Sequence, residues 1–317
     1  MKRTLMAVAL GASLHLAMVA APAGAAPGSN AGAGAAPSAS SASANAMSAA
    51  TSTQTSARHT VLVKREGVTI EVVVEGSGPT LVLLPSRGRG GEDFDEVAAG
   101  FARAGYRVLR PEPRGIGKSV GPMDGITLHD FADDIAMTIR HFGNEPAVVI
   151  GHAFGNWVAR TTAVDYPKLV RGVVIVAAAA KNYPDGMAEH VARSADLSLP
   201  DAERLKSIQY AFFLPGNDAS VWLHGWNTEV SRSQRKAGLA IDQSEWWSGG
   251  TVPLLDLQAG RDLFKPESSR NEVRDEFGDR VTVKVIPDTG HALIPEAPQA
   301  VVDAIVAWEK TIPQAPR

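Results

Sequence analysis

The spacing of apolar residues changes repeatedly along the chain between that of a strand and that of a helix. Runs of apolar and β-branched residues predict eight strands, at 60–63, 68–74, 80–84, 106–109, 146–150, 171–176, 252–257 and 281–286. Apolar stripes with helical spacing predict helices at 92–104, 127–141, 153–165, 267–277 and 298–311. Gly67 separates the first two strands, which predicts a hairpin, and Thr127 fits the N-cap of the second helix.

This alternation of strands and helices predicts the α/β class. A mainly parallel sheet of eight strands, with helices on both faces, is the architecture expected. Residues 58–179 and 251–317 would form this core.

The alternation stops between about 180 and 250, where helical patches occur without a strand run. We predict a helical cap inserted at 180–250, above the carboxyl ends of the strands, where open α/β sheets bind ligands. The segment contains four of the six tryptophans, namely Trp222, Trp226, Trp246 and Trp247. They either pack the cap onto the core, which is the simpler interpretation, or line a substrate site.

The N-terminal segment has a different composition. Residues 1–3 are a short basic start, 5–21 are mostly apolar, and 23–25 (AGA) fit a cleavage site. This pattern predicts a signal peptide at 1–25, and hence a periplasmic or secreted protein. An uncleaved leader acting as a membrane anchor is the alternative. Residues 26–57 are rich in Ala, Ser and Gly and predict a disordered linker.

Composition narrows the range of partners and cofactors. The formal net charge is −3 and no basic stripe occurs, so nucleic acid is not an expected partner. The absence of cysteine excludes disulfides and a thiolate nucleophile. No histidine spacing suggests a metal, and no phosphate-binding loop is present because Glu112 stands where its first glycine is required. A small-molecule substrate or ligand without a cofactor is therefore expected.

The strand predicted at 146–150 runs into a sharp turn. Residues 148–157 read VVIGHAFGNW, and 151–155 fit the spacing G-x-Nu-x-G of a nucleophile elbow, in which Nu is the attacking residue. That position holds Ala153, whose methyl group can neither attack nor ionise.

Together with the element order, the elbow and the insertion point, two further segments resemble the α/β-hydrolase fold family over about 60–312. Residues 83–119 (LLPSRGRGGEDFDEVAAGFARAGYRVLRPEPRGIGKS) are similar to its third strand, oxyanion loop, first helix, fourth strand and D-x-R-G-x-G-x-S turn. Glu112 replaces the usual aspartate of that turn. We expect Arg114 to brace loops, and Asp130, Asp133 and Asp134 to form a solvated helix face.

The resemblance also implies an acid–base pair. Residues 285–301 (VIPDTGHALIPEAPQAV) resemble the loop after the last strand, which makes His291 the candidate base. Residues 254–266 (LLDLQAGRDLFKP) resemble the loop that carries the acid, and Asp262 fits that position. Asp256, inside the strand, is a weaker candidate, and Asp288 is expected to shape the histidine turn.

In this family, two backbone N–H groups form the oxyanion hole. The resemblance assigns one to Phe154, after the elbow, and the other to Arg87, in the loop after the third strand. Ser86, in the same loop, is a speculative alternative nucleophile because this loop faces the elbow in the family's fold.

Three explanations of Ala153 remain open. The chain is an engineered Ser→Ala knockout, or a non-catalytic protein that binds a small apolar ligand, or an enzyme that works without an elbow nucleophile. The presence of both His291 and Asp262 favours an enzyme. Our hypothesis is an exported hydrolase-like, esterase-like enzyme that acts on a small, uncharged, partly apolar molecule.

Overall fold

The computed structural model describes residues 57–182 and 184–314. The predicted signal peptide lies outside these residues, as does the predicted linker except for residue 57. Contacts divide the chain into two units, 1–51 and 52–317, and the second contains all the described residues. Among them, no helix has both the length and the apolar character needed to span a bilayer.

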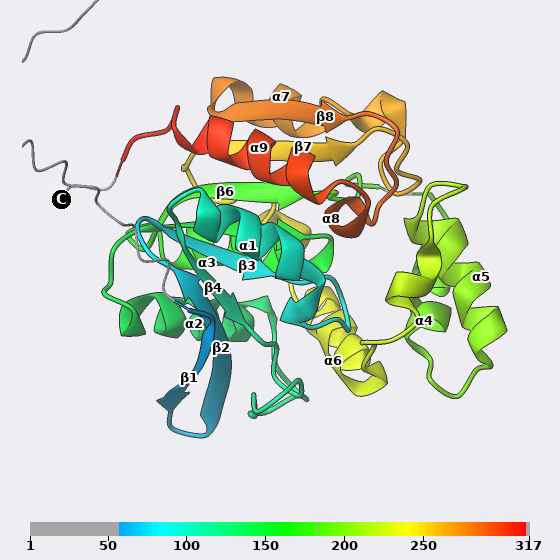
Figure 1. The fold of residues 1–317 in the computed structure, drawn as a ribbon, viewed down its shortest axis with the longest axis horizontal. Coiled ribbons are helices and arrows are strands. Elements are labelled where there is room, and N and C mark those ends of the chain that lie inside the picture. Colours follow the sequence, from blue (N-terminus) through cyan, green and yellow to red (C-terminus); the bar gives the residue numbers. More distant parts are fainter. Residues whose placement is uncertain (1–56, 183, 315–317) are drawn as a thin grey trace, which may run out of the picture. The chain divides into compact units, whose positions relative to one another are not determined.

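Eight strands form one sheet in the order β1-β2-β4-β3-β5-β6-β7-β8 (Figure 1). The strands are β1 (His59–Arg65), β2 (Val68–Gly76), β3 (Thr80–Leu84), β4 (Arg107–Pro111), β5 (Ala147–His152), β6 (Val170–Val176), β7 (Leu254–Ala259) and β8 (Val281–Ile286). The pairs β1–β2 and β2–β4 are antiparallel and all other pairs are parallel. Strands β3, β5 and β7 are buried along their whole length, which explains the apolar runs at 81–84 and 147–150.

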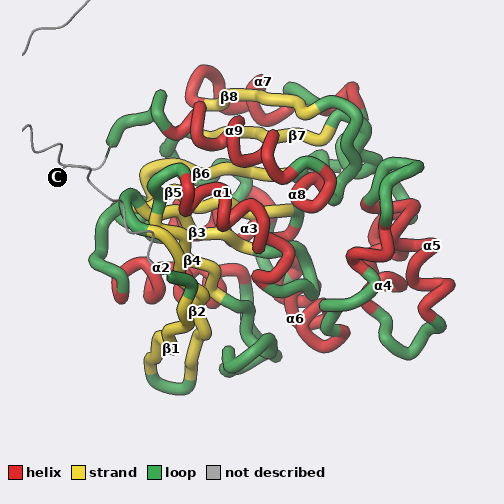
Figure 2. Tube along the Cα trace, viewed as in Figure 1, coloured by secondary structure: helices red, strands yellow, loops and turns green. Residues whose placement is uncertain are grey.

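Helices cover both faces of this sheet (Figure 2). They are α1 (Asp95–Arg103), α2 (Leu128–His141), α3 (Phe154–Asp165), α7 (Glu272–Phe277), α8 (Leu293–Glu296) and α9 (Pro298–Glu309). One apolar cluster joins α1 and α9 to the sheet, and a second joins α2 and α3 to the opposite face. The predicted fold class, a mostly parallel eight-stranded sheet between helices, is confirmed.

One helix begins where the sequence predicted, and another is divided. Thr127 caps α2 and forms a capping box with Asp130, as the sequence predicted for the cap. The single helix expected at 267–277 is instead a 3₁₀ turn, Glu267–Ser269, followed by the short α7.

Between β6 and β7 the described residues form helices and turns without a strand. The helices are α4 (Met187–Ala195), α5 (Asp201–Phe212) and α6 (Thr228–Leu239). Figure 1 shows α4 and α5 on the side of the sheet toward which β7 points. We call residues 180–250 the inserted segment.

Arg114 braces the loop after β4, as expected. Its Nε donates to Asp134 Oδ2 at 2.7 Å, and its Nη1 donates to the carbonyl of Pro122 at 3.0 Å. The same contacts correct the expectation of a solvated acidic face on α2, because Asp134 is buried and also accepts from Arg65 at 2.9 Å. A buried carboxylate needs such partners.

Candidate active site

The turn from β5 into α3 has the backbone conformation of an elbow. Ala153 has φ 47° and ψ −113°, a region that residues other than glycine rarely adopt. Its N–H donates to the carbonyl of Val176 at 3.0 Å, and its own carbonyl accepts from the N–H of Asn156 at 3.1 Å. The surrounding structure therefore holds a strained residue at the position where the family has its nucleophile.

Two glycines make this turn sterically possible. A Cβ at Gly151 would lie 2.2 Å from the carbonyl carbon of Gly155, and a Cβ at Gly155 would lie 2.3 Å from the carbonyl oxygen of Leu84. Any larger residue would push α3 away from β3 and β5. The glycine spacing read from the sequence therefore has a direct packing reason.

The loops after β7 and β8 bring Asp262 and His291 together. His291 Nδ1 lies 2.8 Å from Asp262 Oδ2, and both side chains are buried. The other carboxylate oxygen of Asp262 accepts from the N–H of Phe264 at 2.8 Å. Because a carboxylate only accepts hydrogen bonds, Nδ1 carries the proton, and the lone pair of the neutral imidazole is on Nε2.

Backbone hydrogen bonds hold these two loops at a fixed spacing. Gly260 N–H donates to the carbonyl of Ile286 at 2.8 Å, and Arg261 N–H donates to that of Thr289 at 2.9 Å. Asp288 has φ 52° in the turn before His291, which agrees with the turn-shaping role expected of it.

Asp256, the weaker acid candidate, belongs to a separate buried network. It accepts from Gln258 Nε2 at 2.8 Å and lies 3.6 Å from Lys265 Nζ. Burial raises its pKa above the ordinary aspartate value.

His152, beside the elbow, supports the backbone of the candidate base. Its Nε2 lies 2.8 Å from the carbonyl oxygen of His291 and therefore donates to it. Burial, reinforced by the nearby charge of His291 in its protonated form, lowers the pKa of His152 to about 3. His152 thus stays neutral at physiological pH and keeps this hydrogen bond.

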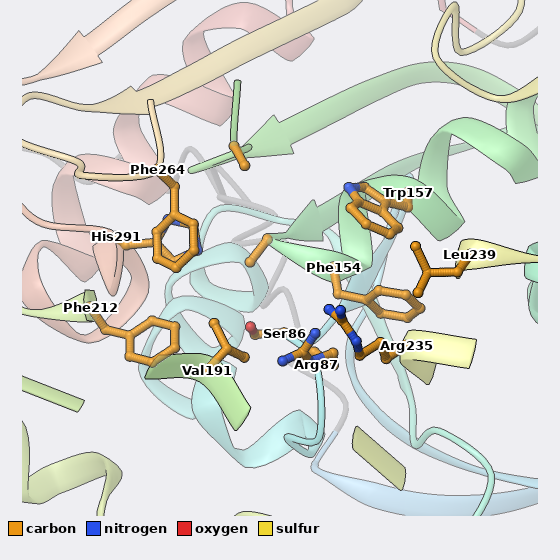
Figure 3. A pocket seen from close by; sticks show the side chains of 12 residues that line it. Ser86, Arg87, Phe154, Trp157, Val191, Phe212, Arg235, Leu239, Phe264 and His291 are labelled. Carbon is orange, nitrogen blue, oxygen red and sulfur yellow. The ribbon is translucent and has the colours of Figure 1, made fainter. Parts of the chain in front are cut away.

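These elements surround a pocket of about 100 Å³ (Figure 3). It is lined by Ser86, Arg87, Ala153, Phe154, Trp157, Ala179, Val191, Phe212, Arg235, Leu239, Phe264 and His291. In Figure 3, Phe264, Phe212 and His291 lie on one side, and Trp157, Leu239 and Phe154 lie on the other. The pocket is therefore largely apolar, with the imidazole of His291 at its wall.

Five of the six residues that the sequence assigned to catalysis or the oxyanion hole line this pocket: Ser86, Arg87, Ala153, Phe154 and His291. The sixth, Asp262, contacts His291 from outside it. Phe154 is the first residue of α3, where backbone N–H groups have no partner within the helix.

The lining role considered for four tryptophans is wrong. None of Trp222, Trp226, Trp246 and Trp247 lines the pocket, and all four are buried. Trp222 and Trp226 pack with Phe212 in the inserted segment, whereas Trp246 and Trp247 join the core cluster of α2 and α3. These four rings therefore contribute buried apolar area to the packing of the two clusters.

Sequence reasoning missed most of the pocket wall, namely Trp157, Ala179, Val191, Phe212, Arg235, Leu239 and Phe264. One signal was available, because Arg235 and Leu239 are four residues apart and share a face of α6. Nothing in the sequence indicated which face of α6 points inward.

Groups of three or more metal-ligating side chains do not occur among the described residues. The chemistry that the arrangement can support is acid–base chemistry by an oriented imidazole, next to backbone N–H donors at the start of a helix.

Comparisons with known proteins agree with this geometry. A family model described as alpha/beta hydrolase fold matches residues 79–205. The 2-(acetamidomethylene)succinate hydrolase of Mesorhizobium japonicum is 31% identical over 109 residues, which cover 34% of this chain and 39% of that protein. The soluble epoxide hydrolase of a Corynebacterium species is 33% identical over 110 residues, covering 35% and 38%.

These matches span about two fifths of the length of the relatives. Among solved structures, the esterase EaEST from Exiguobacterium antarcticum is similar with a TM-score of 0.67 at 20% identity. That likeness covers 78% of this chain and 98% of the esterase, and it concerns the fold.

Proposed function

We propose that the chain, which has the α/β-hydrolase fold, is a hydrolytic enzyme in which His291 activates water directly. The observation that carries the proposal is the 2.8 Å contact between His291 and Asp262 at a pocket that Ala153 also lines. The relatives that match part of its sequence are hydrolases, which supports this class of reaction.

The reaction follows from the tautomer of His291. Nε2 takes a proton from a water molecule while the water oxygen bonds to the carbonyl carbon of an ester or amide. Asp262 stabilises the imidazolium that forms. The C–O or C–N bond then breaks, and the imidazolium returns its proton to the leaving group.

The oxyanion of the tetrahedral intermediate needs hydrogen-bond donors in place before the reaction. We assign this role to the backbone N–H groups of Phe154 and Arg87, since both residues line the pocket. These donors do not depend on the side chain at 153. In serine proteases that lack a member of the triad, binding and the oxyanion hole alone retain roughly 10³–10⁴-fold catalysis.

In this proposal, the attacking water lies next to the methyl group of Ala153. The methyl group occupies less volume than the side chain of a serine, and it stands on the strained turn that faces the pocket. A covalent acyl-enzyme on this residue is excluded because a methyl group has no nucleophilic atom.

Ser86 is a second candidate for the attacking group, because it lines the same pocket as His291. This alternative requires an acyl-enzyme on Ser86. Mass spectrometry after treatment with an organophosphonate distinguishes the two routes, since water activation predicts no label on Ser86.

Turnover of short-chain esters tests the proposal. We expect the His291→Ala variant to lose about 10²–10⁴-fold in kcat/KM, because it lacks the general base. Asp262→Asn should lose activity as well. An asparagine amide can donate to Nδ1 of His291, and the imidazole then carries its proton on Nε2 and cannot act as the base there. His59→Ala is the matched control, since His59 is exposed on β1.

Equal rates for the native protein and His291→Ala on a broad ester panel would refute hydrolysis by this site and favour ligand capture. A large gain from Ala153→Ser would indicate that the remaining catalytic groups suit an ordinary serine hydrolase, as expected of a knockout.

Export of the protein is also proposed, because the sequence predicts a leader at 1–25. Cell fractionation tests this proposal.

A further inference from the structure

The pocket contains two arginine side chains that the proposed hydrolysis does not use. Arg87 lies in the loop after β3 and Arg235 lies on α6. Figure 3 shows both guanidinium groups on the same side of the pocket, below Phe154. None of the twelve residues that line the pocket is an aspartate or a glutamate.

The structure holds the two backbones together. Gly88 N–H donates to Gln234 Oε1 at 2.7 Å, and the carbonyl of Gly88 accepts from the N–H of Asn227 at 2.8 Å. A Cβ at Gly88 would lie 2.7 Å from the Cβ of Ser231, so the loop packs directly on α6. Arg87 precedes Gly88 and Arg235 follows Gln234, so this contact brings the two arginine backbones to the same pocket.

The other cations of α6 have a different environment. Arg232 binds Glu229 at 2.6 Å and Lys236 binds Asp124 at 3.0 Å, all with exposed side chains. Arg89, two residues after Arg87, is buried against the backbone of Trp222 and His224 and pairs with Asp93. Arg235 is exposed like Arg232 and Lys236, but of these three cations only Arg235 lines the pocket.

A second cavity, of about 140 Å³, adjoins the first through the same two arginines. Its lining is mixed, with Ala192 and Ala195 beside Thr228, Ser231 and Arg232. Its one carboxylate, Asp196, is half-buried and accepts from Ser198. Arg87 and Arg235 thus line both cavities, and Arg232 adds a third guanidinium group to the second.

We propose that Arg87 and Arg235 bind a carboxylate of the substrate, so that the substrate is an ester or amide carrying a free carboxylate. This inference rests on the proposed function and replaces the expectation of an uncharged substrate. Guanidinium groups match the planar carboxylate with paired N–H donors, and the apolar walls strengthen the attraction.

Binding can be measured without turnover, by calorimetry with monomethyl glutarate and the neutral dimethyl glutarate. We expect the native protein to bind the monomethyl ester at least about ten-fold more tightly. Arg235→Gln and Arg87→Gln should each reduce this preference about ten-fold. Lys236→Gln removes a charge from the same helix outside the pocket and should leave the preference unchanged.

Turnover of mono-4-nitrophenyl glutarate and its methyl ester separates the two proposals. If neither ester is hydrolysed but the carboxylate is still preferred in binding, the hydrolytic function fails and the anion site stands. Equal binding of the two glutarates, or an unchanged preference in Arg235→Gln, would overturn the anion site even in an active hydrolase. Tighter binding of methyl phosphate than of monomethyl glutarate would overturn the choice of a carboxylate.

Discussion

The two sides of the pocket are built in different ways. On the sheet side, Ala153 follows the buried strand β5 and His291 lies in the loop after β8, and the conformation of the main chain decides where they lie. On the side of the inserted segment, Val191, Arg235 and Leu239 project from α4 and α6, and Leu239 is 68% exposed.

The two sides of the pocket therefore differ in how much substitution they tolerate. The sheet side tolerates little change of shape, because Gly151 and Gly155 already bring backbone atoms into contact. The inserted segment presents long side chains at its surface, where a substitution changes the pocket without disturbing the core. We therefore expect the candidate chemistry to depend on the first side and the choice of substrate on the second.

The largest expected effect comes from breaking the sheet side. Gly155→Ala places a Cβ 2.3 Å from the carbonyl oxygen of Leu84, so α3 must move. We expect the free energy of unfolding to fall by at least about 3 kcal/mol, measured by denaturant titration.

The control for this variant lies in the inserted segment. Gly186→Ala acts at a positive φ, of 82°, unlike Gly155→Ala, but no atom lies within 4 Å of the new Cβ. This variant should lower the free energy of unfolding by only about 1–2 kcal/mol. Equal losses in the two variants would contradict the proposed rigidity of the sheet side.

A smaller, pH-dependent effect is expected at Glu112, in the loop after β4. Its carboxylate accepts from the N–H of Gly91 at 2.8 Å, and burial raises its pKa from 4.5 to about 7. A carboxyl group whose pKa is raised in the folded state stabilises the protein below pH 4.5, and this contribution is lost as the pH rises through 7.

Glu112→Gln cannot ionise and should not show this loss. Between pH 5 and pH 8, we expect the native protein to lose on the order of 2 kcal/mol more than the variant, measured by denaturant titration at each pH. Glu66→Gln, in the exposed hairpin turn, should behave like the native protein. Parallel pH profiles for native protein and Glu112→Gln would refute the assignment.

The smallest expected effect on stability concerns the inserted segment. Leu239→Ala should change the free energy of unfolding by no more than about 0.5 kcal/mol, because the side chain is mostly exposed. Val174→Ala, at a buried position in β6, is the comparison variant and should lower the free energy of unfolding by about 2 kcal/mol. A loss above 1 kcal/mol for Leu239→Ala, in the same denaturant titration, would place this residue in the core.

Much of the sheet side could be read from the sequence. The order of strands and helices follows from apolar spacing, which each segment carries within itself. The elbow follows from two glycines four residues apart. The resemblance to a known family predicted that His291 and Asp262 form an acid–base pair. The 2.8 Å contact between them depends on the parallel pairing of β7 and β8.

The inserted segment was harder to predict, and the tryptophans illustrate why. Their number and position drew attention to a substrate site, but burial in two apolar clusters determines where they lie. Asp134 similarly reads as a surface charge in the sequence, and only its contact with Arg114 shows that it is buried.

The sequence by itself determined the fold class, the elbow and the identity of the residue that cannot attack, because these depend on local spacing and residue type. The tertiary structure decided which side chains face the pocket. Arg87 and Arg235 are 148 positions apart, and only the packing of Gly88 on α6 brings their segments together. Such contacts depend on shape complementarity between distant segments, which the spacing within one segment does not encode.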